Sequence, residues 1–116
     1  HLSKIKTSLK NLDYLEKSLN TLNVKYKILF NKKNTIHFSP KIVIYQKKNN
    51  IEFIWNNKEF ELVTDLSFWE QNVSIDEFLE NLVKQYTYEA ICNETENLGF
   101  TKIKEENNTI LLERWI

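Results

Sequence analysis

Residues 51–80 read IEFIWNNKEFELVTDLSFWEQNVSIDEFLE, and this stretch decides the fold. Apolar and polar residues alternate with a period of two from residue 51 to 55 and again from residue 60 to 63, which is typical of β-strands. Asn56 and Asn57 separate the two runs, and asparagine tolerates the positive φ that a two-residue type I′ turn requires. The pattern therefore predicts a β-hairpin.

The predicted turn sets the pairing of the hairpin. It places Phe53 opposite Phe60 and Ile51 opposite Leu62 on one face of the sheet. Glu52 would then lie opposite Glu61 on the other face, which water must reach because two like charges face each other. A second turn at Asn49-Asn50 would join a preceding strand and bring Ile44 opposite Trp55. The predicted core face carries Ile42, Ile44, Ile51, Phe53, Trp55, Phe60 and Leu62.

A long helix follows the hairpin. Ser74 and Glu77 have the spacing of a capping box, with Ser74 at the N-cap. Gly99, the only glycine of the chain, stands where a helix of about 24 residues would need a left-handed C′ residue. Apolar residues recur at spacings of three and four along this helix and predict one buried stripe: Ile75, Phe78, Leu79, Leu82, Val83, Tyr86, Ala90, Ile91 and Leu98.

The remaining elements complete an α+β fold. Asn11 is the predicted N-cap of a first helix whose stripe is Leu12, Leu15, Leu19 and Leu22, and Asn23 is expected to end it. Further strands are predicted at residues 2–7, 24–30, 41–47, 100–105 and 109–115, the last two joined by Asn107-Asn108 with Lys102 opposite Glu113 and Phe100 opposite Trp115. The order is βαβ–βββ–α–ββ. We expect a single domain over residues 1–116, an antiparallel-rich sheet with two helices on one face, layered as in ferredoxin-like folds.

Composition limits the functions that fit. Lysine, asparagine and isoleucine are abundant, as expected of an AT-rich genome, and Cys92 is the only cysteine, so no intrachain disulfide can form. Residues 1–50 carry a net charge of +9 and residues 51–116 a net charge of −9. Two outcomes follow: the halves form separate faces with a strong dipole, or their strands interleave and the charges largely neutralise each other.

Catalytic and cofactor sites are not indicated. His1, His37 and Cys92 lack the spacing of a metal site, and one glycine cannot build a phosphate-binding loop. A nucleophilic pair of Cys92 and His37 is less in keeping with the helix than a small partly buried thiol. Asp65 follows a strand, where a cap or turn role is favoured over chemistry. We therefore expect a protein that is not an enzyme and holds no cofactor.

Two surfaces are candidates for contact with partners. The sheet face opposite the helices would present apolar and acidic side chains to another protein, whereas the three tryptophans are expected in the core. The basic first half could instead bind nucleic acid, although the glutamates of the sheet would repel phosphate. The protein-contact candidates are Val43, Tyr45, Glu52, Ile54, Glu59 and Glu61, and the basic candidates are Lys25, Lys27, Lys32, Lys33, Lys47 and Lys48.

The run from Phe53 to Trp69 resembles a chloroplast and cyanobacterial reading-frame family called ycf thirty-five. Members of that family carry a similar Trp-Asn-x-Lys-x-Tyr/Phe-Glu-Leu-Val-x-Asp-Leu-x-Phe-Trp run. The opening residues 1–7, the Tyr86 region, Gly99-Phe100 and Arg114-Trp115 look similar too, so the resemblance spans nearly the whole chain. Asn57 departs from the pattern, because a glycine is usual there, and this weakens the turn only.

The resemblance implies a plastid-encoded protein of the stroma, and it brings no established activity and no catalytic residues. Together with the residue inventory, it leads us to expect an accessory or assembly factor of the photosynthetic apparatus that acts by protein–protein contact. A protein partner is then expected and nucleic acid disfavoured, with peripheral but not integral association with membranes. The alternative is an RNA-binding or regulatory module that uses the basic first half.

Overall fold

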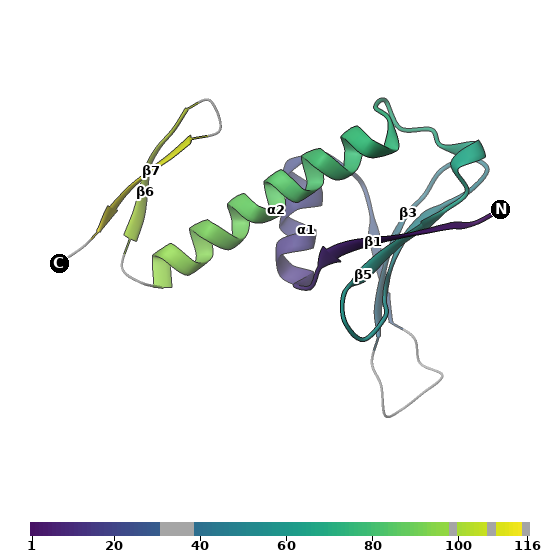
Figure 1. Cartoon of the computed structure of the whole chain (residues 1–116), viewed down its shortest axis with the longest axis horizontal. Helices are drawn as coiled ribbons and strands as arrows, with labels where there is room; N and C mark the ends of the chain where they lie inside the picture. Colours follow the sequence, from purple (N-terminus) through teal and green to yellow (C-terminus); the bar gives the residue numbers. More distant parts are fainter. Residues whose placement is uncertain (31–38, 98–99, 107–108, 115–116) are drawn as a thin grey trace.

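The computed structural model describes residues 1–30, 39–97, 100–106 and 109–114 of the chain (Figure 1). The elements follow the order predicted from the sequence and confirm an α+β fold. They are β1 (Ser3–Leu9), α1 (Leu12–Thr21), β2 (Lys27–Phe30), β3 (Pro40–Ile44), β4 (Ile51–Trp55), β5 (Phe60–Thr64), the 3-10 turn η1 (Leu66–Phe68), α2 (Ile75–Asn97), β6 (Phe100–Glu106) and β7 (Thr109–Arg114).

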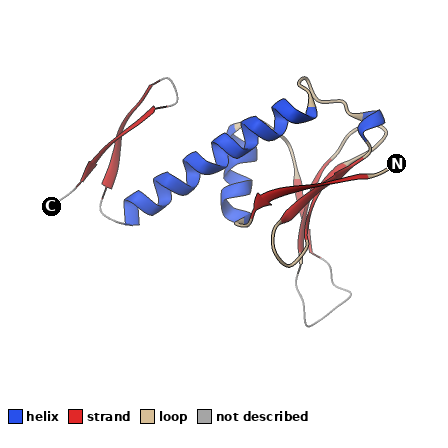
Figure 2. Ribbon diagram, viewed as in Figure 1, coloured by secondary structure: helices blue, strands red, loops and turns tan. Residues whose placement is uncertain are grey.

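Five strands form the main sheet in the order β1-β5-β4-β3-β2, with every neighbouring pair antiparallel. Strands β2 to β5 are a meander, whereas β1 joins the far side of β5. Helix α1 connects β1 to β2 and therefore crosses from one edge of the sheet to the other. Both helices lie on one face of this sheet (Figure 2), so the likeness to ferredoxin-like folds is one of layering and not of strand order.

The core lies between the sheet and the two helices, as the sequence predicts. Leu15 and Leu19 of α1 and Phe78 and Leu82 of α2 pack on the predicted face of the sheet. Trp55 and Trp69 are partly buried against this cluster, in agreement with the prediction that they belong to the core. The buried cluster comprises Leu9, Leu15, Leu19, Ile42, Ile44, Ile51, Phe53, Phe60, Leu62, Phe78 and Leu82.

Helix α1 begins and ends as its sequence predicts. The Asn11 side chain accepts a hydrogen bond from the Tyr14 amide at 3.1 Å, so Asn11 is the N-cap. Asn23 has φ of 59°, and the Val24 amide donates to the Leu19 carbonyl at 2.9 Å. A left-handed residue followed by this backward bond is a Schellman ending. Asparagine takes the conformation that glycine would otherwise supply.

The pairing of the central hairpin differs from the prediction. Trp55 lies opposite Phe60, Phe53 opposite Leu62 and Glu52 opposite Val63, a shift of two residues. The Asn56 amide donates to the Glu59 carbonyl at 3.0 Å, so Asn57 and Lys58 are at the centre of the turn. The side-chain carbonyl oxygen of Asn56 also accepts hydrogen bonds from the backbone amides of residues 58 and 59. Asn57 has a φ of 79°. The predicted pairing was wrong because Asn56 is not one of the two central residues of the turn. It precedes them and stabilises the turn with its side chain.

The loop before β4 is longer than the predicted Asn49-Asn50 turn. Ile44 lies opposite Ile51 instead of Trp55, and residues 45–50 form the connection. Gln46 organises this loop, because its side-chain amide nitrogen donates a hydrogen bond to the Asn49 carbonyl at 2.8 Å. Its side-chain oxygen accepts from the Glu70 amide at 3.0 Å. These bonds tie the loop to the segment after η1 and stop β3 from continuing.

Helix α2 is buried along its first half only. The Ser74 hydroxyl accepts from the Glu77 amide at 3.2 Å, which confirms the N-cap. Phe78 and Leu82 are buried, whereas Val83 and Ile91 are 41% and 40% exposed. The stripe of the sequence thus spans two faces of the helix. The expected C′ residue Gly99 and its neighbour Leu98 lie outside the described residues.

Beyond Leu82, polar contacts hold α2 against the start of α1. The Tyr86 hydroxyl accepts from the Asn11 amide at 2.9 Å, and the Asn93 side chain donates to the Tyr14 hydroxyl at 2.7 Å. The rings of Tyr14 and Tyr86 meet edge to face at 5.7 Å. Hydrogen bonds of this kind fix how the helix is rotated about its own axis, which apolar contacts alone specify less sharply.

Strands β6 and β7 form a separate two-stranded sheet beyond the end of α2 (Figure 1). Glu106 lies opposite Thr109, as a turn at Asn107-Asn108 requires, although those two residues are outside the described part. A shift of one residue between Lys102 and Lys104 then changes the register. Phe100 consequently lies opposite Arg114 instead of Trp115, and Lys102 opposite Leu112 instead of Glu113, because a bulge in one strand consumes an extra residue.

The left-handed conformation of Asn23 makes its substitution informative. Asn23→Gly should leave the free energy of unfolding unchanged or raise it, whereas Asn23→Ala should lower it by about 1 kcal/mol, because a Cβ without a polar group is disfavoured at positive φ. Urea denaturation of both variants measures the difference. Equal stabilities would contradict the left-handed assignment.

The two faces of α2 can be compared at neighbouring positions. Leu82→Ala should lower the free energy of unfolding by about 2–5 kcal/mol, because the side chain is fully buried in the core. Val83→Ala should change it by less than about 0.5 kcal/mol, since that side chain is 41% exposed. Thermal denaturation under identical conditions checks the pair, and similar losses for the two would contradict the described orientation of the helix.

Candidate interaction surface

The outer face of the main sheet, opposite the helices, is built from two rows of side chains that the strand pairing fixes. One row crosses the five strands and alternates cationic, apolar and anionic groups. The second row runs parallel to it, two residues further along each strand. Among the residues that the structure describes, these rows are Lys27, Val43, Glu52, Val63 and Lys4, and Leu29, Lys41, Ile54, Glu61 and Lys6.

Opposite charges are interleaved on this face, which decides between the two outcomes left open by the sequence. The basic strands β1 and β3 flank the acidic strands β4 and β5. The Lys41 ammonium lies 3.3 Å from a Glu52 carboxylate oxygen, and Glu61 accepts from the Asn56 side chain at 2.7 Å. The charges of the sheet thus largely neutralise one another, whereas α2 keeps an excess of acid: Asp76, Glu77, Glu80, Glu89, Glu94 and Glu96 against Lys84.

The predicted contact residues differ in how far a partner could reach them. Tyr45 is 55% exposed at the end of the face, and Ile54 is half-buried near its centre. Val43 is only 2% exposed, because the long side chains beside it cover it. Glu52 and Glu61 border Ile54, while Glu59 lies in the hairpin turn instead of on the strand. The structure therefore brings Tyr45, Glu52, Ile54 and Glu61 onto one accessible face.

The predicted basic residues do not form one patch. Lys25 and Lys27 are exposed at the β2 edge, and the Lys27 ammonium lies 5.9 Å from the centre of the Tyr45 ring. Lys47 and Lys48 stand on the loop after β3, where the Lys48 ammonium lies over the Phe68 ring at 5.8 Å. Lys32 and Lys33 fall outside the described residues.

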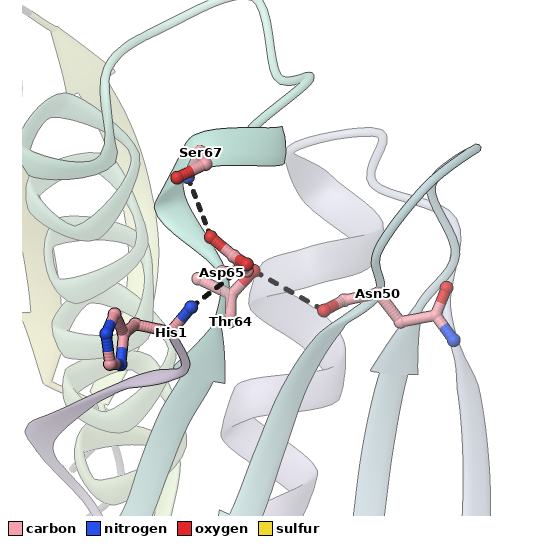
Figure 3. A network of polar contacts seen from close by, with 5 residues as sticks. All are labelled: His1, Asn50, Thr64, Asp65 and Ser67. Atoms are coloured by element: carbon pink, nitrogen blue, oxygen red, sulfur yellow. Dashed lines mark hydrogen bonds and ion pairs between the residues drawn. The ribbon is translucent and has the colours of Figure 1, made fainter.

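Asp65 acts as a cap, as its place after a strand predicts (Figure 3). Its side chain accepts from the Ser67 amide at 3.0 Å and so starts the 3-10 turn. Its other oxygen lies 3.5 Å from the amino group of His1. The hydrogen bond from the Ser67 amide is the main cause that lowers the pKa of Asp65; burial opposes it, and the amino group of His1 lowers the pKa further. The adjacent Thr64 hydroxyl donates to the Asn50 carbonyl at 3.4 Å.

The other candidates for chemistry stay apart. Cys92 is half-buried in α2, and His37 is outside the described part of the chain. Within the described ranges, no three histidine, cysteine, aspartate or glutamate side chains gather closely enough to bind a metal ion. Neither described helix has the length and apolarity that a membrane crossing demands.

Two hollows border the β2 end of the sheet, and the sequence did not indicate them. One, of about 370 Å³, lies between the chain before β2, the end of β3 and the start of α2. The other, of about 800 Å³, is an open groove between the end of α1 and the β2 edge. It is lined by Asn20, Asn23, Val24, Lys25, Tyr26 and Ile28.

Sequence reasoning missed Gln46 and the hydrogen-bonding role of Tyr86, which it placed only in the apolar stripe of the long helix. Gln46 links two segments that are more than twenty positions apart, and Tyr86 caps the start of a helix from another helix. Both contacts are long-range hydrogen bonds of single polar side chains. No local period or spacing in the sequence marks such residues.

The lowered pKa of Asp65 leads to a pH prediction. A carboxyl whose pKa is lower in the folded state stabilises the fold fully above its unfolded pKa, and this stabilisation is lost as the pH falls through the folded value. We expect a titration midpoint below the ordinary 3.8 by carbon NMR of the side chain. We also expect Asp65→Asn to make stability less dependent on pH below that value. A midpoint at or above 3.8 would contradict the cap.

Comparison with known proteins shows the family to which the chain belongs. A family described as a protein of unknown function, DUF1257, matches residues 8–110. An uncharacterized protein ycf35 of Guillardia theta is 42% identical and is aligned over 99% of this chain and 97% of its own length. A protein of the same name from Trieres chinensis is 39% identical and is aligned over 93% of this chain and 88% of its own length. The one from Cyanophora paradoxa is 35% identical and is aligned over 99% of this chain and 97% of its own length.

No solved structure matches the chain. The family match covers most of the sequence, and the named relatives align with it over nearly their full lengths. The expectation from the run at residues 53–69 is therefore confirmed. The chain belongs to the ycf35 family, a group of uncharacterised reading frames of algal plastids.

Proposed function

We propose that this protein is a non-enzymatic accessory or assembly factor of the photosynthetic apparatus, acting in the plastid stroma by contact with another protein. The observation that supports the proposal best is the outer face of the main sheet. Both helices pack on the opposite face, and no other described segment packs over the two rows of outward side chains. A sheet face left open in this way can dock a partner.

The chemistry of this face suits protein better than nucleic acid. Tyr45 and Ile54 offer apolar area, and tyrosine is enriched at protein interfaces because its ring is apolar and its hydroxyl polar. Glu52 and Glu61 lie among the lysines and would repel phosphate. Charges of alternating sign beside the apolar side chains Tyr45 and Ile54 give orientation and specificity to a protein contact.

The contact can be tested with a tagged chain in plastid extract. Wild type and a Val83→Ser control should recover the same photosynthetic subunit, whereas Tyr45→Ala combined with Ile54→Ser should recover at least about tenfold less, because the apolar contacts of the outer face are lost. Quantitative mass spectrometry measures the recovery. Equal recovery with the outer-face variant would contradict the assignment of the surface, and recovery of nucleic acid alone would contradict the function.

The RNA-binding alternative has one supporting observation. The Lys27 ammonium lies 5.9 Å from the centre of the exposed Tyr45 ring, and base stacking on an aromatic ring beside lysines is a common mode of single-strand binding. Such binding to plastid RNA would weaken steeply with salt, and Lys32→Gln with Lys33→Gln would weaken it further. Binding that is absent or independent of salt would exclude this alternative.

A further inference from the structure

Strand β2 is an edge of the main sheet that can accept another strand. Within the described residues it pairs only with β3, through Lys27, Ile28 and Leu29 among others. The chain leading into it, Val24 to Tyr26, lies outside any strand. An edge strand presents a row of amide and carbonyl groups on its outer side, and an extended peptide can pair with them.

The opposite edge is protected against such pairing. On β1, the exposed Lys4 and Lys6 alternate along the strand, and the register shifts between Lys6 and Leu9. Ser8 has φ of 64° at this irregularity, and the Thr7 hydroxyl donates to the Phe60 carbonyl within it. Lysines stand on both edges, so the bulge is what distinguishes β1, because a bulge on an edge strand discourages strand addition. Only the β2 edge combines free pairing groups with a groove beside it, among the described strands of the main sheet.

The groove beside β2 has a side chain pattern that an added strand would meet. Val24, Tyr26 and Ile28 alternate with exposed lysines and are packed, partly buried, against the core. The last turn of α1 forms the other wall with the side chains of Asn20 and Asn23. The added strand would therefore turn every second side chain into a largely apolar groove of about 800 Å³.

Charge determines what the two faces of the added strand should carry. The Tyr26 hydroxyl donates to Glu16 at 3.2 Å, and burial together with the Glu16 carboxylate raises the pKa of Tyr26. The lining of the groove is largely apolar, with Asn20, Asn23 and Lys25 as its polar members, so apolar side chains suit this side of the added strand. On the other face, Lys25 and Lys27 are exposed at neighbouring outward positions and attract acidic side chains. If the β2 edge of a second copy of the chain were added instead, Lys27 would lie beside the lysines of that copy, and the like charges would repel each other.

We propose that the β2 edge binds an extended segment of a partner protein in which apolar residues, facing α1, alternate with acidic residues, facing Lys25 and Lys27. The segment pairs with the main-chain groups of Lys27 to Leu29 and extends the sheet to six strands. This site adjoins the outer face, to which Lys27 and Leu29 belong, but it does not use Tyr45 or Ile54 and does not depend on the function proposed for them. Recognition combines main-chain bonds, which give affinity, with the alternation, which gives specificity.

The probe for this site is a capped peptide, Ser-Glu-Val-Glu-Val-Glu-Val-Glu-Ser, added to the full chain. We expect amide NMR shifts concentrated at residues 24–29 and slower hydrogen exchange of the amides of Lys27 to Leu29. A version with lysine in place of glutamate, and a version N-methylated at alternate amides along one edge, should bind at least about tenfold more weakly, since each removes one part of the recognition.

Variants of the protein separate this site from the outer face. Lys25→Glu with Lys27→Glu should weaken the peptide at least about tenfold, whereas the exposed Lys58→Glu in the central hairpin turn and Ile54→Ser on the outer face should leave the affinity within about twofold. Circular dichroism melting confirms that each variant is folded. Shifts centred on Ile54, equal binding of the N-methylated peptide, or protection of Lys27 to Leu29 by self-association of the chain alone would each overturn the proposal.

Discussion

Four side chains of the helices, Leu15 and Leu19 from α1 and Phe78 and Leu82 from α2, close the apolar layer over the main sheet. Burial of each contributes about 1.5–3 kcal/mol against exposure to water, and partly buried side chains of both helices, such as Leu12 and Leu79, pack against the same cluster. This requirement explains the topology. To reach the layer, α1 must cross the whole sheet, which puts β1 and β2 at opposite edges and the acidic hairpin β4–β5 between basic strands.

Polar side chains then fix the relative positions of segments that the apolar layer alone does not specify. Gln46 ties the loop after β3 to the segment after η1, and the Trp69 indole donates to the Val73 carbonyl at 2.7 Å while its ring packs edge to face on Phe78. Tyr86 satisfies main-chain donors at the start of α1. Each of these side chains makes directional hydrogen bonds to a segment distant in sequence, and these bonds fix the position of one segment relative to the other.

The sequence predicted the faces of the fold better than its pairings. Side chains of a strand alternate, so the shift of two residues in the central hairpin leaves Phe53, Phe60 and Leu62 on the core side although their partners change. The asparagine pairs were ambiguous because asparagine can occupy the centre of a turn or hold it from outside. The outer face followed from the same alternation, whereas the groove beside β2 did not. That groove depends on where α1 ends relative to the sheet edge, which only tertiary packing determines.

The change from apolar to polar contacts along α2 affects how the protein unfolds. Its first half shares the apolar core, whereas its second half is held by the hydrogen bonds of Tyr86 and Asn93 and leads into a two-stranded sheet of its own. Segments with few apolar contacts open at a lower free energy than the whole domain, and isolated two-stranded sheets are marginally stable. The second half of α2 and the β6–β7 sheet are therefore expected to open at a lower free energy than the five-stranded layer.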